Sequence, residues 1–199
     1  MPDPTSEAGP DDDRADMAQL RADHPAALDR IIHRHGTAIH AYLLRLVHDA
    51  EDARDLTLET FVRIHAHRAR FDPRRPFATW LYTIATNLAR DRLRWRARHP
   101  EVPLPTFETS RTTSDPSALP IASADPSQDL MHAERAAAVR QAIARLPDDL
   151  RAALVLSEFE NQSNAEIASV MGCSTKAIEM RLYRARHQLR NLLAQWILD

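Results

Sequence analysis

Two short helices joined by a tight turn are predicted within residues 163–190. Ser163 and Glu166 form a capping box, in which each side chain bonds the backbone of the other residue at the start of a helix. Gly172 then ends that helix, because a residue without a Cβ takes the left-handed conformation most easily, and Ser174 caps the next one. Each helix has one apolar face, formed by Ile167, Ala168 and Met171 in the first and by Ile178, Leu182, Ala185 and Leu189 in the second. This pattern is typical of a helix-turn-helix.

The second of these helices carries cations on the face opposite its apolar stripe, namely Lys176, Arg181, Arg184, Arg186 and Arg190. Glu179 is the one acid among them. An α-helix fits the major groove of DNA, where such side chains contact bases and phosphates. A basic helix face is often no more than solvated surface. Together with the capped helix and the glycine turn, it favours a helix that reads DNA.

The composition of the chain favours helices throughout. Among 199 residues there are only three glycines, and no run of alternating β-branched residues suggests a strand, so we predict an all-α fold. The net charge of −2 hides a strong asymmetry. Acids gather near the N-terminus, at Asp3, Glu7, Asp11, Asp12, Asp13 and Asp16, and arginines gather at Arg90, Arg92, Arg94, Arg96 and Arg98. The distribution of charge is therefore compatible with a nucleic-acid partner.

The sequence favours a cytoplasmic location. Cys173 is the only cysteine, which excludes an intramolecular disulfide and suits a reducing compartment. No apolar run approaches the roughly 20 residues that a membrane helix needs. The acidic start is also unlike a signal peptide, so we expect no membrane insertion.

Proline and charge divide the chain into two helical domains. Residues 1–18 are acidic and almost devoid of apolar side chains, so we expect them to be disordered. Residues 19–98 form a first helical domain, in which two helical stretches meet near Gly36. Residues 99–129 are rich in proline and are expected to form a flexible linker. Residues 130–199 form a second domain, which carries the helix-turn-helix and is tethered to the first, not fused with it.

An acidic helix face is predicted within residues 49–64. Asp52, Asp55 and Glu59 lie on one side of this helix. Another face is apolar and is formed by Ala53, Leu56, Thr60, Phe61 and Ile64. The three carboxylates could act as general acids, bind a metal ion or dock on a basic partner. No histidine or cysteine accompanies them at ligand spacing, so we expect no metal or other cofactor, and the docking interpretation stays open.

A long amphipathic helix follows a proline-bounded turn at residues 71–76. Its apolar positions are Phe77, Trp80, Leu81, Ile84, Ala85 and Leu88, and an arginine-rich continuation reaches Arg98. The simplest interpretation of Trp80 is core packing. Aromatic rings beside cations also suit single-stranded nucleic acid, because bases stack on the rings and cations bind the phosphates. The residues alone leave both interpretations open.

The order of these segments resembles that of a known family. The familiar stretches are residues 41–46, 52–61, 79–92 and 146–150, followed by the helix-turn-helix that ends at Arg186. Together they resemble a bacterial RNA polymerase sigma factor of the extracytoplasmic-function (ECF) class, which has sigma regions two and four. The resemblance covers residues 24–98 and 131–193, with the proline-rich linker between them.

The resemblance implies three contact surfaces. RNA polymerase core would bind, through the clamp of its largest subunit, to Asp52, Asp55, Leu58 and Glu59. Promoter DNA would be melted, and its single strand held, by Phe71, Arg74, Arg75, Trp80, Tyr82, Asn87, Arg90 and Arg94. Duplex promoter DNA would be read by Thr175, Lys176, Glu179, Met180, Arg181, Tyr183, Arg184 and Arg186. The resemblance also implies a stress- or signal-responsive set of target genes and an anti-sigma factor as a further partner.

Three residues depart from the usual pattern of this family. Leu58 stands where glutamine is usual, Arg54 replaces a usual acid, and Glu179 stands where lysine or arginine is common. A carboxylate at position 179 would lose a phosphate or guanine contact but could accept a hydrogen bond from cytosine. The resemblance therefore does not fix the promoter sequence that the protein reads.

Two other functions account for parts of the sequence. A stand-alone transcriptional regulator would explain the helix-turn-helix but leave the acidic helix and residues 77–98 unexplained. An enzyme is less well supported, because histidine pairs such as His33 with His35 do not share a helix face, and no nucleophile or phosphate-binding loop stands out. We therefore interpret the chain as a sigma factor and not as an enzyme.

Overall fold

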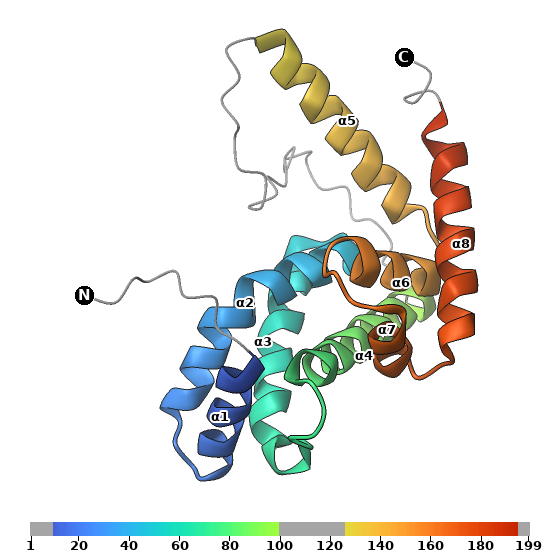
Figure 1. Cartoon of the computed structure of the whole chain (residues 1–199). Coiled ribbons are helices and arrows are strands. Elements are labelled where there is room, and N and C mark those ends of the chain that lie inside the picture. The colour runs from blue at the N-terminus through green and yellow to red at the C-terminus, as the bar shows by residue number, and fades with distance from the viewer. Residues whose placement is uncertain (1–9, 100–125, 195–199) are drawn as a thin grey trace.

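The computed structural model describes residues 10–99 and 126–194, which form helices joined by short turns, without a strand. The first stretch contains α1 (Pro10–Arg21), α2 (Ala26–Val47), α3 (Ala50–Ala66), the 3-10 helix η1 (Arg68–Arg70) and α4 (Phe77–Arg98). The second contains α5 (Pro126–Ala144), α6 (Asp148–Glu158), α7 (Asn164–Met171) and α8 (Thr175–Leu192) (Figure 1). The predicted all-α fold is confirmed for these residues. Most of the predicted linker lies outside them, and its last residues, from Pro126 onward, belong to α5.

Helix α1 corrects the expectation that residues 1–18 are disordered. Residues 1–9 lie outside the described part of the chain, but a helix begins at Pro10 and buries Met17 and Leu20 almost completely. Its acids Asp13 and Asp16 form ion pairs of 2.6–2.9 Å with arginines of α2. The acidic composition suggested disorder because the cations that neutralise it lie on another helix.

Helix α2 runs without interruption through Gly36, where we expected two helical stretches to meet. Ile31 on one side of this glycine and Ile39 on the other are fully buried in the same core. This shared packing offsets the roughly 1 kcal/mol that glycine costs inside a helix relative to alanine. Further along α2, the hydroxyl of the buried Tyr42 lies 2.7 Å from that of Thr86 on α4, which ties the two helices together.

The helix-turn-helix is confirmed. Ser163 and Glu166 make both capping-box bonds at the start of α7, and Gly172 ends this helix with a left-handed backbone (φ 64°). The Ser174 hydroxyl accepts a hydrogen bond from the N–H of Ala177 and so caps α8. The apolar stripe of α8 is buried at Ile178, Leu182 and Ala185.

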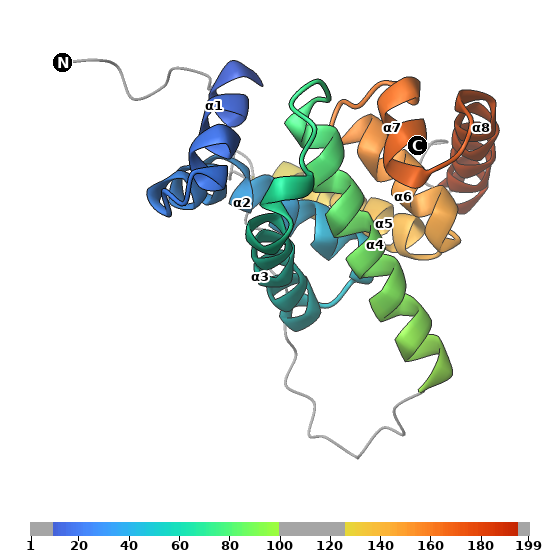
Figure 2. The same ribbon diagram turned by 90° about the horizontal axis from the view of Figure 1, so that it is seen from below.

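The two helical groups are packed together, where we expected them to be only tethered. Helices α6 and α7 lie against α2 and α4 (Figures 1 and 2), and buried residues of both groups form one core. At this contact the buried Arg151 of α6 donates a hydrogen bond to the carbonyl of Leu46, 105 positions earlier in the chain. Carbonyls in the last turn of a helix lack a partner within that helix, so Arg151 caps α2.

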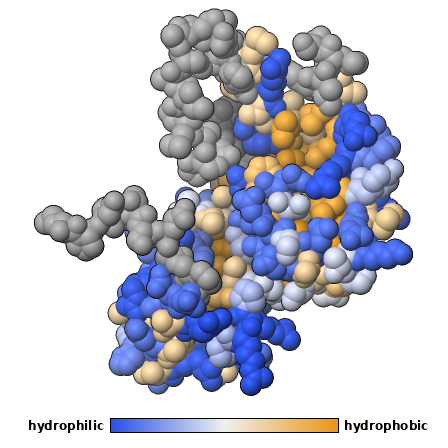
Figure 3. All heavy atoms as spheres, in the orientation of Figure 1, coloured by the Kyte–Doolittle hydropathy of each residue, from blue (hydrophilic) through white to orange (hydrophobic). Residues whose placement is uncertain are grey.

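A groove between α5 and α8 exposes hydrophobic residues, and Figure 3 shows them at the surface in this half of the molecule. Its volume is about 300 Å³, and its apolar lining consists of Ala137, Ala138, Ala142, Leu192 and Leu193. Among the described side chains of α5, the buried ones are Ala142 and Ile143, near its C-terminal end. Most of α5 therefore projects from the body, as Figure 1 shows.

Candidate polymerase and promoter interfaces

Asp52, the first of the predicted polymerase contacts, is buried against α4. Only 7% of the residue is exposed, and its carboxylate forms ion pairs with Arg92 and, at 2.6 Å, with Arg96. Asp49 caps α3 by accepting a hydrogen bond from the backbone N–H of Asp52, and this bond, together with Arg96, lowers the pKa of Asp49. Asp52 therefore anchors α3 to α4, which corrects its assignment to a partner-facing surface.

A strip of α3 remains accessible to a partner, and we name its four residues, Asp55, Leu58, Glu59 and Val62, the α3 strip. Glu59 is partly buried and pairs with Arg63 at 2.8 Å. Leu58 is 63% exposed and Val62 is 60% exposed. They lie one helical turn apart, so the strip combines an apolar pair with two carboxylates. Val62 was not among the predicted contacts, although its position four residues after Leu58 and off the buried face could have identified it.

The predicted base-capture segment begins with packed aromatic rings. Phe71 is buried, and its ring centroid lies 5.9 Å from that of Phe77 and 5.3 Å from that of Trp80. Phe71 is thus a core residue here, which corrects its assignment as a base contact. Arg74 and Arg75, three and four residues later, are exposed. Trp80 is partly buried, so it contributes to the core and still presents some surface.

Tyr82 is covered by the segment that joins α6 to α7. Its hydroxyl donates a hydrogen bond to the Glu160 carboxylate, and Arg45 lies 4.0 Å from the same carboxylate and 4.4 Å above the Phe159 ring. Burial raises the pKa of Tyr82, and the charge of Glu160 adds to this effect. Burial likewise raises the pKa of Glu160, against the opposing effects of Tyr82 and Arg45. In this arrangement a DNA base cannot stack on Tyr82.

Farther along α4, the predicted contacts differ in how accessible they are. Asn87 and Arg94 are exposed. Arg90 is partly buried and forms an ion pair of 3.2 Å with Asp149, and the same aspartate pairs with Arg181 of α8 at 3.1 Å. Asp149 of α6 therefore joins an arginine of the predicted melting helix to an arginine of the predicted reading helix.

Helix α8 presents most of the predicted reading residues on its outer face. The exposed ones are Thr175, Lys176, Glu179, Met180, Tyr183, Arg184 and Arg186. Arg186 pairs with Glu158 at 2.7 Å. Arg181 is partly buried, and its guanidinium lies 3.3 Å from the sulfur of Cys173 in addition to its contact with Asp149. The structure thus brings seven of these eight residues to one accessible helix surface.

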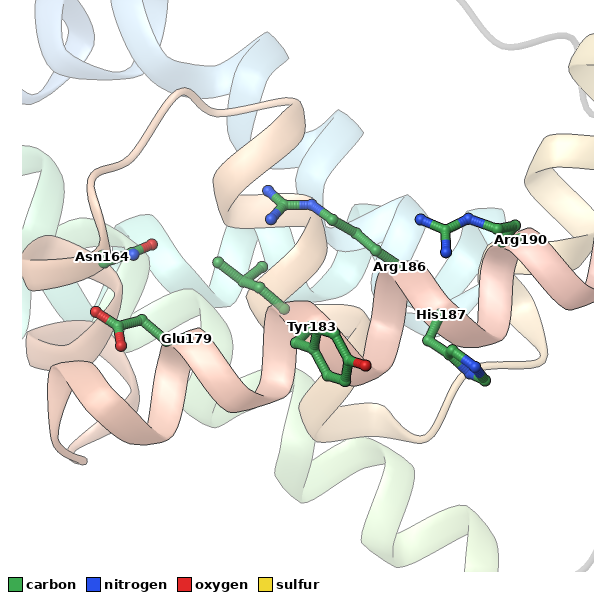
Figure 4. Close-up of a pocket in the computed structure, with 7 residues that line it drawn as sticks. Asn164, Glu179, Tyr183, Arg186, His187 and Arg190 are labelled. Atoms are coloured by element: carbon green, nitrogen blue, oxygen red, sulfur yellow. The ribbon is translucent and has the colours of Figure 1, made fainter.

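Figure 4 shows a shallow groove along this helix, with a volume of about 300 Å³. Its lining includes Glu179, Tyr183, Arg186 and two residues that the sequence analysis did not single out, Asn164 and His187. Helical spacing could have identified His187, which lies one turn after Tyr183 with their ring centroids 6.4 Å apart. Asn164 is the first residue of α7, and it lies near α8 because the turn between the two helices brings them together.

The described residues contain no group of three or more histidine, cysteine, aspartate or glutamate side chains arranged to hold a metal ion. None of their helices has the length and apolar character needed to cross a membrane.

Comparison with known families gives two matches. Residues 31–99 match Sigma-70 region 2, and residues 136–189 match Sigma-70 region 4. RNA polymerase sigma-H factor of Pseudomonas aeruginosa is 35% identical over 167 residues, which cover 84% of this chain and 86% of the relative. RNA polymerase sigma factor CarQ of Myxococcus xanthus is 31% identical over 185 residues, which cover 92% of this chain and 98% of the relative.

Solved structures show the same fold. The structure of CnrH in complex with the cytosolic domain of CnrY aligns with a TM-score of 0.67 at 27% identity, covering 92% of this chain and 98% of that one. The sigma factor RpoE of Bartonella quintana, in complex with the anti-sigma factor NepR, aligns with a TM-score of 0.62 at 22% identity, covering 83% of this chain and 96% of that one.

Proposed function

The chain belongs to the ECF class of RNA polymerase sigma factors, and we propose from this membership which of its surfaces meet the polymerase and the promoter. A protein of this class binds RNA polymerase core and directs it to specific promoters to initiate transcription. It is an initiation factor and not an enzyme, so we assign no catalytic residue and no cofactor. Because it works on the polymerase, we place it in the cytoplasm.

The α3 strip is the proposed docking surface for the polymerase clamp. It is the part of the predicted polymerase-binding helix that stays accessible, since Asp52 is held by α4. Two exposed apolar side chains can be buried in a complex, while Asp55 and Glu59 offer charge to a basic partner. We propose that Val62 belongs to this surface together with Leu58.

The turn at residues 71–76 and the exposed face of α4 are the proposed grip on melted promoter DNA. Arg74, Arg75 and Arg94 are exposed cations for phosphates, and Asn87 is an exposed amide for a base edge. Trp80 supplies an aromatic surface for stacking. We propose that Tyr82 joins them only after the segment carrying Glu160 has moved away from it.

Helix α8 is the proposed reader of duplex promoter DNA. Its outer face exposes Lys176, Arg184 and Tyr183 beside the groove of Figure 4. This face, presented by a properly capped helix-turn-helix, is the observation that carries the proposed function most directly. We propose that it works as part of a unit of residues 130–199, while residues 19–98, extended by α1, form the unit that melts the promoter.

An anti-sigma factor is the proposed regulatory partner. Both aligned complexes contain another protein bound to the sigma factor, CnrY in one and the anti-sigma factor NepR in the other. We propose that such a partner holds this protein inactive until a stress or another signal releases it.

Reconstituted run-off transcription tests the proposed function. Bacterial RNA polymerase core is given a pool of promoter fragments from the source genome, with and without this protein, and promoter-specific transcripts are expected only with it. Asn87→Ala and Arg184→Ala remove exposed side chains of the two proposed DNA surfaces and should abolish most of these transcripts. Arg21→Ala, an equally exposed change on α1, is the matched control.

The same experiment distinguishes a sigma factor from a stand-alone transcriptional regulator. A stand-alone regulator would bind specific duplex DNA by itself, would not bind core polymerase and would yield no transcripts. That result would overturn the proposed function.

A further inference from the structure

We propose that α1 and the turn after it position the loop that grips melted promoter DNA, with Arg14 and Asp23 as the two positioning residues. This inference rests on the proposed function of residues 71–76. It assigns a role to a helix that lies outside the matched sigma region two, which begins at residue 31.

Two contacts join this N-terminal segment to the connection between α3 and α4. The Nε of Arg14 donates a hydrogen bond of 2.9 Å to the backbone carbonyl of Pro73. Asp23, in the turn between α1 and α2, accepts a hydrogen bond of 2.5 Å from Arg68 of η1. Figure 2 shows α1 beside this connection. The connection is thus held at two points, Arg68 and Pro73, by one preceding segment.

Helix α1 is itself firmly fixed, so these contacts can hold the loop in place. The Arg34 guanidinium bonds Asp13 at 3.0 Å and Asp16 at 2.6 Å, and Arg30 bonds Asp16 at 2.8 and 2.6 Å. These bonds join charged groups, and both aspartates are largely buried, which makes the bonds strong. Met17, fully buried, completes the attachment through apolar contact.

The held carbonyl lies directly before the exposed cations of the loop. Arg74 follows Pro73, and the side chain of Asp72 accepts a hydrogen bond from the Arg74 backbone at 3.0 Å. Pro73 and Pro76 have little freedom in φ, so fixing one carbonyl restricts the path of the whole turn. Loss of the hydrogen bond from Arg14 should therefore leave Arg74 and Arg75 less well positioned. The exposed surfaces of α3 and α8 should not change.

The test compares two promoter templates in run-off transcription with core polymerase. One is fully paired, and the other is mismatched over the melted region, so that the template itself supplies strand separation. Arg14→Ala and Asp23→Gly are tested singly and together. Glycine suits position 23, because the backbone there is left-handed (φ 60°), a conformation that glycine adopts readily, and because it has no side chain to accept the hydrogen bond from Arg68.

The double variant should lose about three- to tenfold of its transcription on the paired template and less than about twofold on the mismatched one. Arg14→Lys should keep most of the transcription that Arg14→Ala loses, because lysine can still donate a hydrogen bond to the carbonyl. Arg21→Ala, on the same helix, is the control. Thermal unfolding is measured for every variant, and should the double variant unfold early, the two single variants decide the question.

Two results would overturn this inference. One is unchanged transcription from the paired template, and the other is an equal loss on both templates. Failure of the wild-type protein on both templates is a different result, since it would overturn the proposed function and, with it, the role of α1.

Discussion

Glu179 is the residue on which the promoter preference of this protein should depend most. It is exposed in the groove of α8, and no cation among the described residues forms an ion pair with it. A carboxylate is repelled by phosphates, so on a DNA-reading helix it is best placed against a base edge, where cytosine N4 offers a donor. We expect Glu179→Gln to weaken the preference for one C·G pair by about 1–3 kcal/mol.

Transcription or binding measured on a library of single-base promoter variants checks this prediction. Arg190→Gln serves as the control, because loss of a cation should weaken binding to all sequences about equally. An unchanged base preference in the Glu179 variant would rule out a reading role for this carboxylate.

His48 should make the folded protein sensitive to acid. Burial, followed by the nearby charge of Arg151, lowers the pKa of His48 to about 4. Its unfolded value lies near 6.5, so the unfolded chain binds more protons between these limits, and stability falls as the pH falls from 6.5 towards 4. The loss at pH 5 should be about 1 kcal/mol, less than the full shift implies because the side chain keeps some contact with solvent.

Chemical denaturation at pH 7 and pH 5 measures this loss. His48→Asn is the informative variant, because asparagine fits the left-handed backbone at this position (φ 55°) and does not titrate in this range. An equal acid-dependent loss in the variant and the wild type would mean that other groups are responsible.

At the scale of single residues, local chemistry was predictable and distant partners were not. Ser163, Glu166 and Gly172 act within a few positions of themselves, so their roles follow from spacing alone. The burial of Asp52 depends on Arg92, 40 positions away. Nothing in the sequence near Asp52 distinguishes a carboxylate that will meet that arginine from one that stays exposed.

At the scale of the element, the α3 strip should carry binding energy for the polymerase. Replacing Leu58 or Val62 by alanine removes exposed apolar surface that a complex would bury, which should cost about 1–2 kcal/mol of affinity per residue. Core binding measured by fluorescence anisotropy or calorimetry checks this value.

Ile32→Ala is the matched control for these two variants, since Ile32 is also an exposed apolar residue but lies on α2. All three changes should leave the free energy of unfolding nearly unchanged. Equal affinity for core in the strip variants and the control would remove the α3 strip from the interface.

Helices were predictable from the sequence where an apolar stripe repeats over several turns. Helices α3, α4 and α8 have such stripes, and their predicted core residues are largely buried. Helix α1 has only Met17 and Leu20 to bury, and much of what holds it comes from arginines of α2. A short acidic helix of this kind cannot be recognised from the sequence until the position of the helix that supplies its arginine partners is known.

At the scale of the whole molecule, the packing of the two helical groups, together with ion pairs inside the second group, explains why free protein should bind promoter DNA weakly. Tyr82 is covered by Glu160, and three arginines assigned to DNA are engaged by acids of α6. The sequence indicated two groups and a proline-rich connection but could not reveal this contact. The packing of the two groups depends on individual interactions, such as the hydrogen bond from Arg151 to the last turn of α2, and these leave no periodic pattern in the sequence.

Neutralising Asp149 should raise the affinity of the free protein for promoter DNA, because this aspartate holds Arg90 and Arg181 at once. Surface ion pairs are worth about 0.2–1 kcal/mol each, so Asp149→Asn should tighten binding by about two- to fivefold in anisotropy measurements at low salt. Asp29→Asn removes the same charge from an exposed position on α2 and controls for the change in net charge.

Since two released arginines can neutralise additional phosphates, binding of the Asp149 variant should also depend more steeply on salt. Equal gains in the two variants would show that net charge, and not the two ion pairs of Asp149, limits binding to DNA.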